Sequence, residues 1–190
     1  MEAPTLYMNE VSPPARGAIL VASALGVPLN LVTINVFAGE HLSPEYEKKN
    51  PLRLIPLLEE NNFTLGDSHA IAGYLATAYG RTDELYPKEP RRKARVDQLL
   101  HFDSSVLFIN MRHVIVSTLV LCVTLREKVY SSLGVLEKYL EEHAWVAGDS
   151  MTIADLCCLA TTTSIHEIIP VTSDRYVRWL AKVGLLRPKT

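Results

Sequence analysis

The spacing of hydrophobic and polar positions changes several times in the first 40 residues, and each change predicts a new element. Residues 4–8, "PTLYM", are strand-like. The next segment, "SPPARGAILVASALG", repeats apolar side chains at helical spacing, at Ala15, Ile19, Ala22 and Leu25. Gly26 ends that helix, and residues 29–37 are rich in branched side chains, which is typical of a strand. This part is predicted to be strand, helix, strand.

The pattern between residues 42 and 80 predicts a short helix, a hairpin and a longer helix. Ser43 and Pro44 are helix-start residues, and two apolar runs, Ile55–Leu58 and Phe63–Leu65, are separated by the turn-forming "EENN". Ser68 is then expected to cap a helix that ends at Gly80. The order βαβ, α, ββα predicts an α/β domain over residues 1–80 with a mixed, four-stranded, thioredoxin-like sheet.

The second half of the chain predicts helices only. Residues 81–90, "RTDELYPKEP", have two prolines and no periodicity, so we place a linker there and an all-helical domain over 91–190. Within that domain, Thr152 and Asp155 have the spacing of a capping box. The apolar run Val114–Leu125 has only 12 residues, too few to cross a membrane, and is interpreted as a buried helix.

Composition narrows the class of protein. The formal charge is −2, so nothing in the overall charge favours nucleic acid as a partner. The run "RRKAR" at 91–95 is interpreted as a solvated helix surface, with a nucleic-acid contact as the alternative. Cys122, Cys157 and Cys158 lack metal-ligand spacing and are expected to be reduced core thiols. Without a signal peptide or a nucleotide or metal motif, we expect a cytoplasmic protein with no metal.

Three local features could carry chemistry. Ser12 precedes two prolines at a helix start, where its hydroxyl can donate to an anion or serve only as an N-cap. Pro56 begins a strand of the hairpin, where a cis bond would leave the Ile55 backbone open to an extended peptide. Asp67 and Ser68 lie at a helix start and can hold an ammonium and a carboxylate or serve only as capping residues. Together they predict a cleft for a small zwitterionic peptide.

Several segments, in this order along nearly the whole chain, resemble cytosolic glutathione S-transferases of the insect delta/epsilon type. They are "SPPARGAILVASALG", "AGEHLSPEYEKKNP", "IPLLEENNFTLGDSHAI", "YLATAYG", "LYPKEP", "LLHFDSSVLF" and "MTIADL". The resemblance implies a homodimeric enzyme that conjugates the glutathione thiolate to hydrophobic electrophiles, as in detoxification. It also implies that glutathione is the co-substrate and that Ser12 donates a hydrogen bond to its sulfur.

The resemblance further implies the roles of other residues. His41 would reach the glycine carboxylate, Ile55 would bind through its backbone, and Asp67 with Ser68 would hold the γ-glutamyl end. The whole glutathione site would be formed by His41, Arg53, Leu54, Ile55, Pro56, Asp67, Ser68, Arg112 and Asp103, the last approaching the partner subunit's glutathione. The hydrophobic co-substrate site would be bordered by Val11, Pro13, Phe37, Phe108, Met111, Ile115 and Leu119, for which ordinary core packing is the alternative.

The sequence departs from the family pattern at three places. The usual "NPQHTIP" reads "NPLRLIP" here, so Arg53 replaces a glutathione-binding histidine. The segment between Met111 and Glu137 is shorter and more apolar than in the family, and the sequence ends at "RWLAKVGLLRPKT", before a terminal helix, which predicts an unusually open pocket. These departures keep an alternative open, a glutathione-binding member with weak or no catalysis.

Overall fold

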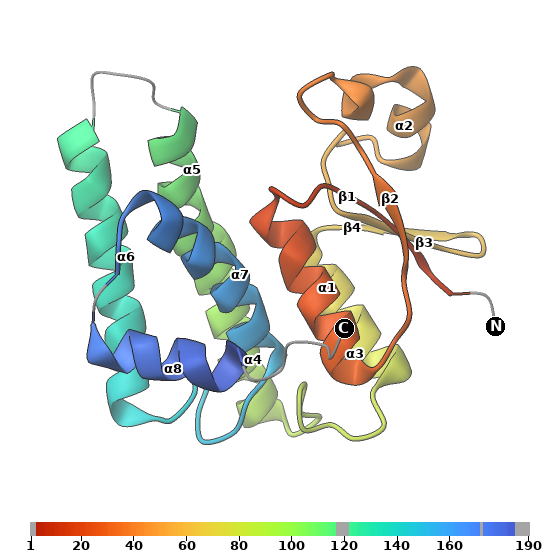
Figure 1. Cartoon of the computed structure of the whole chain (residues 1–190). Helices are drawn as coiled ribbons and strands as arrows, with labels where there is room; N and C mark the ends of the chain where they lie inside the picture. The colour runs from red at the N-terminus through yellow and green to blue at the C-terminus, as the bar shows by residue number, and fades with distance from the viewer. Residues whose placement is uncertain (1–2, 117–121, 172, 185–190) are drawn as a thin grey trace. The chain divides into compact units, whose positions relative to one another are not determined.

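The computed structural model describes residues 3–116, 122–171 and 173–184 (Figure 1). The chain divides into two compact units, Met1–Arg81 and Thr82–Thr190. Each unit has its own core, so each is described by itself.

The first unit contains a four-stranded mixed sheet. Its strands are β1 (Thr5–Met8), β2 (Asn30–Thr33), β3 (Leu57–Glu60) and β4 (Phe63–Gly66). Their order across the sheet is β2-β1-β3-β4, with β1 parallel to β2 and antiparallel to β3, and β3 antiparallel to β4. This confirms the predicted α/β arrangement, although β2 is shorter than the branched run at 29–37.

Helices cover both faces of this sheet. The helices are α1 (Pro13–Leu25), the 3-10 turn η1 (Glu40–Leu42), α2 (Pro44–Lys49) and α3 (Ser68–Tyr79). Helices α1 and α3 lie side by side (Figure 1). Tyr46 of α2 packs with Tyr7 and Leu57, which are cross-strand partners on one face of the sheet. Side chains alternate along a strand, so the neighbouring pair Leu6 and Leu58 points to the opposite face.

Short-range capping bonds define the helix starts of the first unit. The Ser12 hydroxyl accepts a hydrogen bond from the Ala15 N–H, and the Ser43 hydroxyl accepts one from the Tyr46 N–H at 3.2 Å. The predicted cap at Ser68 is wrong by one residue. Asp67 caps α3 instead, because one of its carboxylate oxygens accepts the N–H groups of both His69 and Ala70.

The second unit is all-helical, as predicted. It contains α4 (Pro90–Phe102), the π-helical turn η2 (Asp103–Leu107), α5 (Phe108–Val116), α6 (Cys122–Glu142), α7 (Ile153–Ile168) and α8 (Asp174–Gly184). Helix α7 is central, since it contacts α4, α5, α8 and η2, and it contains the buried thiols Cys157 and Cys158. The side chain of Cys122 lies outside the described residues. None of the helices in the described ranges has the length and apolar character needed to cross a membrane.

The apolar run Val114–Leu125 does not form one buried helix, so that prediction is wrong. Val116 ends α5 and Cys122 begins α6, and the residues between them lie outside the described ranges. Ile115 is exposed, although it belongs to the run. Helices α5 and α6 pack against each other, so the apolar residues at both ends of the run belong to a helix pair rather than to one long segment.

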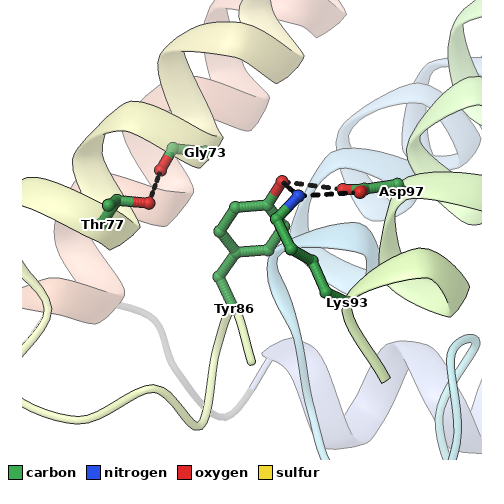
Figure 2. Close-up of polar contacts among 5 residues, drawn as sticks. All are labelled: Gly73, Thr77, Tyr86, Lys93 and Asp97. Atoms are coloured by element: carbon green, nitrogen blue, oxygen red, sulfur yellow. Dashed lines mark hydrogen bonds and ion pairs between the residues drawn. The ribbon is translucent and has the colours of Figure 1, made fainter. Parts of the chain in front are cut away.

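The basic run at 91–95 forms the first turns of α4. Glu89 caps this helix by accepting the N–H groups of Arg91 and Arg92. Lys93 donates hydrogen bonds to Asp97 at 2.8 Å and to the Tyr86 hydroxyl at 2.7 Å (Figure 2). These hydrogen bonds raise the pKa of Lys93. One member of the run therefore has an internal structural role.

Within α3, the Thr77 hydroxyl donates a hydrogen bond to the Gly73 carbonyl at 2.7 Å (Figure 2). Hydroxyl groups of helical threonines commonly return to the carbonyl four residues earlier. This bond satisfies the exposed Thr77 side chain within its own helix.

Glu60 on β3 links the hairpin to α3 and makes stability depend on pH. Its carboxylate accepts hydrogen bonds from the Tyr74 and Tyr79 hydroxyls, which lower its pKa. Burial, followed by the bond to Glu60, raises the pKa of Tyr79 to about 12. The folded state thus binds fewer protons at Glu60 than the unfolded state. This contribution is complete above the unfolded glutamate pKa and is lost as pH falls through the lower folded value.

Replacing Glu60 with glutamine is expected to lower the free energy of unfolding at pH 7 by about 1 kcal/mol, because hydrogen bonds to a charged acceptor are stronger. The difference between wild type and Glu60→Gln should shrink as pH falls below about 4.5. Urea unfolding between pH 3 and 7 measures it. Glu45→Gln, at an exposed site on α2, is the matched control. A difference that stays constant over this range would contradict the assigned role of Glu60.

Candidate active site

The topology of the first unit brings four loops to one end of the sheet. Strand β1 ends near the start of β3, since Tyr7 is paired with Leu57, and Gly66 at the end of β4 is paired with the same Leu57. Met8 at the end of β1 is paired with Thr33 at the end of β2. The loops leading to Ser12, His41 and Asp67, and the segment Ile55–Pro56, therefore all meet the same edge of the sheet.

Ser12 lies at the N-terminus of α1 and is its N-cap. Its hydroxyl oxygen accepts the Ala15 N–H at 3.4 Å, a long hydrogen bond, and its own backbone N–H donates to the Asn9 carbonyl at 3.0 Å. A serine hydroxyl also has one proton to donate. The capping role and the donor role are therefore compatible, because capping uses only a lone pair of the oxygen.

The loop before Ser12 is held by residues that the sequence analysis did not select. The Asn9 side chain donates to the Ile34 carbonyl at 2.9 Å and accepts the Val11 N–H at 3.1 Å. The Arg16 guanidinium donates to the Glu10 carbonyl at 2.9 Å, and burial lowers its pKa. Asparagine is frequent in such loops because its side chain bonds to nearby backbone, and this was the only signal in the sequence.

The segment before β3 has the predicted cis peptide bond between Ile55 and Pro56. The preceding carbonyl, that of Leu54, accepts the Tyr46 hydroxyl at 2.8 Å and the Asn50 amide at 2.7 Å. Burial is the main cause that raises the pKa of Tyr46 to about 12. Within the described part of the chain, the backbone N–H and carbonyl of Ile55 have no hydrogen-bond partner.

Asp67 and Ser68 form the corner between β4 and α3. Asp67 has a positive φ of 69°, and one oxygen of its carboxylate, Oδ1, accepts the N–H groups of His69 and Ala70 at 2.9 and 3.0 Å. The other oxygen, Oδ2, takes no part in these two bonds and can accept from a cationic group. Ser68 is buried at the first turn of α3. A carboxylate and a helix start thus lie next to each other.

The remaining candidates in the first unit lie on the loops around α2. The Nδ1 atom of His41 is buried and has no partner among the described residues. Arg53 has a positive φ of 54°, and its guanidinium lies 4.0 Å from the Glu47 carboxylate. Phe37 is 84% exposed, and Val11 and Leu54 are also mostly exposed, whereas Pro13 and Pro56 are buried. Large apolar side chains in this unit are therefore open to solvent.

The candidates in the second unit lie on η2 and α5. Asp103 is buried in the π-helical turn, a form of helix that is often found at functional sites. Arg112 and Ile115 are exposed, Phe108 is half-buried, and Met111 is buried against the core. Leu119 lies outside the described residues. Among those that are described, no three histidines, cysteines or acidic residues are arranged to hold a metal ion.

Comparison with known proteins decides the family. The family model described as "Glutathione S-transferase, N-terminal domain" matches residues 6–87, and "Glutathione S-transferase, C-terminal domain" matches residues 122–181. The chain is 40% identical to glutathione S-transferase 1 of Manduca sexta, over 96% of this chain and 88% of that protein. This chain belongs to the glutathione S-transferase family.

Solved structures of insect glutathione transferases have the same fold. A delta-class enzyme of Nilaparvata lugens is 35% identical, with a TM-score of 0.91 over 98% of this chain and 90% of that chain. A Drosophila mojavensis homolog, solved with bound glutathione, is 32% identical, with a TM-score of 0.92 over 100% of this chain and 90% of that chain. The prediction of an insect delta/epsilon-like glutathione S-transferase, and therefore of an enzyme, is confirmed.

Proposed function

We propose that this glutathione S-transferase binds glutathione at the end of its sheet and conjugates the thiolate to hydrophobic electrophiles. The observation that carries the proposal is the convergence of four loops at one sheet edge, with the Ser12 hydroxyl at the start of α1. The solved relative with bound glutathione supports the choice of ligand.

Ser12 would act by stabilising the sulfur anion. A free thiol with a pKa of about 8.5 is only a few per cent ionised at pH 7. A hydrogen bond to a charged acceptor contributes roughly 1.5 to 3 kcal/mol, which lowers the thiol pKa by about one to two units. The positive end of the α1 dipole acts in the same direction. A large fraction of bound glutathione would then be the nucleophilic thiolate.

The rest of the tripeptide would be held at complementary positions. The free oxygen of Asp67 would accept the γ-glutamyl ammonium, and the α3 start at Ser68 would receive the γ-glutamyl carboxylate. The unpaired backbone groups of Ile55 would bond to the peptide backbone in the manner of an added strand, next to Leu54 and Pro56. His41 and Arg53 would receive the glycine carboxylate, with Arg53 supplying the positive charge of the usual histidine.

The helical unit would supply the hydrophobic co-substrate site. Phe108, Met111, Ile115 and Leu119 would border it together with Val11, Pro13 and Phe37 of the first unit, and Arg112 would oppose the anionic peptide. We further propose a cytoplasmic homodimer in which Asp103 approaches the partner subunit's glutathione, and a detoxifying role. The exposed apolar side chains at Val11 and Phe37 favour a hydrophobic electrophile over a polar one.

Calorimetric titration of the full chain with glutathione and with S-methylglutathione tests the proposal. The two ligands share every peptide group, but only glutathione has an ionisable thiol. Titrations in two buffers of different ionisation enthalpy should show that glutathione releases a proton on binding near pH 7, whereas S-methylglutathione releases almost none. A conjugation assay with an aryl halide, followed by absorbance, should show turnover in the same preparation.

Each combination of results has one meaning. Binding with proton release and turnover supports the transferase. Binding without turnover overturns the conjugation step and supports the alternative, a glutathione-binding member with weak or no catalysis. Failure of both ligands to bind overturns both the transferase function and the glutathione-binding alternative. Salt-sensitive nucleic-acid binding that is indifferent to Ser12→Ala would instead favour a role for the basic run at 91–95.

A further inference from the structure

The second unit contains a hollow that none of the proposed glutathione contacts uses. It lies between the C-terminal end of α6 and one face of α8 and has a volume of about 250 Å³. Arg175, Arg178 and Lys182 line it from α8, Glu141 lines it from the last turn of α6, and His143 follows that helix. A water molecule occupies about 30 Å³ of liquid, so the hollow has room for a small ligand rather than for one or two waters.

The charge of this hollow is strongly positive. Its three cations outnumber the carboxylate of Glu141, so the lysine, arginine and glutamate side chains of the lining have a net charge of +2. Glu141 is paired with Arg175 at 2.9 Å, and both side chains are about half exposed, so this ion pair is weak. Within the described residues, Arg178 and Lys182 form no ion pair, and Lys182 only lies over the Trp145 ring at 5.9 Å.

The spacing of these cations is unfavourable for the isolated helix. Residues 175, 178 and 182 are separated by three and four positions, so they occupy one stripe of α8. Like charges at these spacings repel each other and destabilise a helix. His143, which also lines the hollow, contacts Asp149 at 3.3 Å. A bound anion would remove the repulsion.

We propose that this hollow binds the phosphate group of a small molecule. A phosphomonoester has close to two negative charges at neutral pH, which matches the net charge of the lining residues. The oxygens of a phosphate are arranged tetrahedrally, so they can accept hydrogen bonds from cationic side chains on successive turns of α8. The two coplanar oxygens of a carboxylate match the fork of a single arginine best. The buried Trp179 ring forms an apolar wall of the site.

The chain contains a direct reporter for this site. It has two tryptophans, and both belong to this region, since Trp179 lines the hollow and the Trp145 ring contacts Lys182. Titration of the full chain with inorganic phosphate at constant ionic strength should therefore produce a saturable change in intrinsic fluorescence. Phosphate should also raise the thermal midpoint, because a ligand that binds only the native state stabilises it.

Arg178→Ala/Lys182→Ala is the test variant. Both side chains are exposed, so their removal should not impair folding. Losing two charge-assisted hydrogen bonds should weaken phosphate binding at least tenfold and abolish the rise in thermal midpoint. Arg91→Ala/Lys128→Ala removes the same charge from exposed sites elsewhere in the unit and should leave binding unchanged within twofold. Ser12→Ala should also bind phosphate normally, because the two sites are independent.

Three results would overturn the proposal. The first is the absence of a saturable fluorescence change with phosphate when sodium chloride is the ionic-strength control. The second is an equal loss of binding in the test variant and in the matched control, which would indicate diffuse charge attraction. The third is tighter binding of succinate than of phosphate, which would assign the hollow to a dicarboxylate.

Discussion

Replacing Ser12 with alanine is expected to reduce kcat/KM for conjugation by about 10- to 100-fold at pH 6.5, because one charge-assisted hydrogen bond to the thiolate is lost. The pH profile should move as well. In the wild type, kcat/KM should rise with an apparent pKa of about 6.5 to 7.5, and in Ser12→Ala that value should return toward about 8.5. Steady-state rates between pH 5.5 and 9 measure both effects.

Ser12 is also a helix cap, so the loss of thiolate stabilisation in Ser12→Ala has to be distinguished from a loss of protein stability. Removing a serine cap costs about 1 kcal/mol of stability on its own. Ser12→Thr keeps the cap and the hydroxyl and should restore most of the activity. Ser43→Ala removes an equivalent cap, that of α2, and should shift the thermal midpoint without shifting the pH profile. An unchanged pH profile in Ser12→Ala would rule out the proposed thiolate stabilisation.

Replacing Asp155 with alanine is expected to be the most destabilising single change, by about 3 to 5 kcal/mol. Asp155 is fully buried and accepts four hydrogen bonds. They come from the Val146 N–H at 2.9 Å, the Thr152 N–H at 2.9 Å, the Thr152 hydroxyl at 3.2 Å and the Trp179 indole at 3.0 Å. Alanine would leave donors from three segments buried without an acceptor. Thermal unfolding should show a midpoint lowered by roughly 10 °C.

A milder variant keeps this prediction testable if Asp155→Ala does not fold. Asp155→Asn preserves the side-chain volume but replaces one accepting oxygen with an NH2 group, which is itself a donor. The free energy of unfolding should therefore fall by about 2 kcal/mol. Asp149→Asn is the matched control, because the Asp149 side chain is 92% exposed and contacts the His143 ring at the surface. A double-mutant cycle with Trp179→Phe measures the coupling to α8. Equal stability of Asp155→Asn and wild type would contradict the proposed network.

The residues that the sequence analysis located correctly act over short distances. Ser12 with its two prolines, the capping box at Thr152 and Asp155, and the hairpin turn at Asn61 all depend on partners within a few positions. One local reading was wrong by a residue, since both Asp67 and Ser68 can cap a helix. The structure selects Asp67, because its carboxylate accepts the N–H groups of His69 and Ala70.

Contacts between residues that are distant in sequence could not be predicted from local patterns. Tyr46 and Asn50 fix the Leu54 carbonyl, and Glu60 receives two hydroxyls from α3. Trp179 reaches Asp155 across 24 positions. Each of these polar groups has several possible partners in the sequence, and only the packing of the elements decides which partner lies within hydrogen-bonding distance.

The sequence by itself determined the order of strands and helices and the serine at the start of α1, because periodicity and capping are properties of neighbouring residues. The tertiary structure decided which loops meet. The pairing of β1, β3 and β4 brings the segments around Ser12, Ile55 and Asp67 to one sheet edge, and the packing of α8 against α6 creates the cationic hollow. Both sites depend on contacts between strands or helices that are distant in sequence, and local sequence patterns do not determine such contacts.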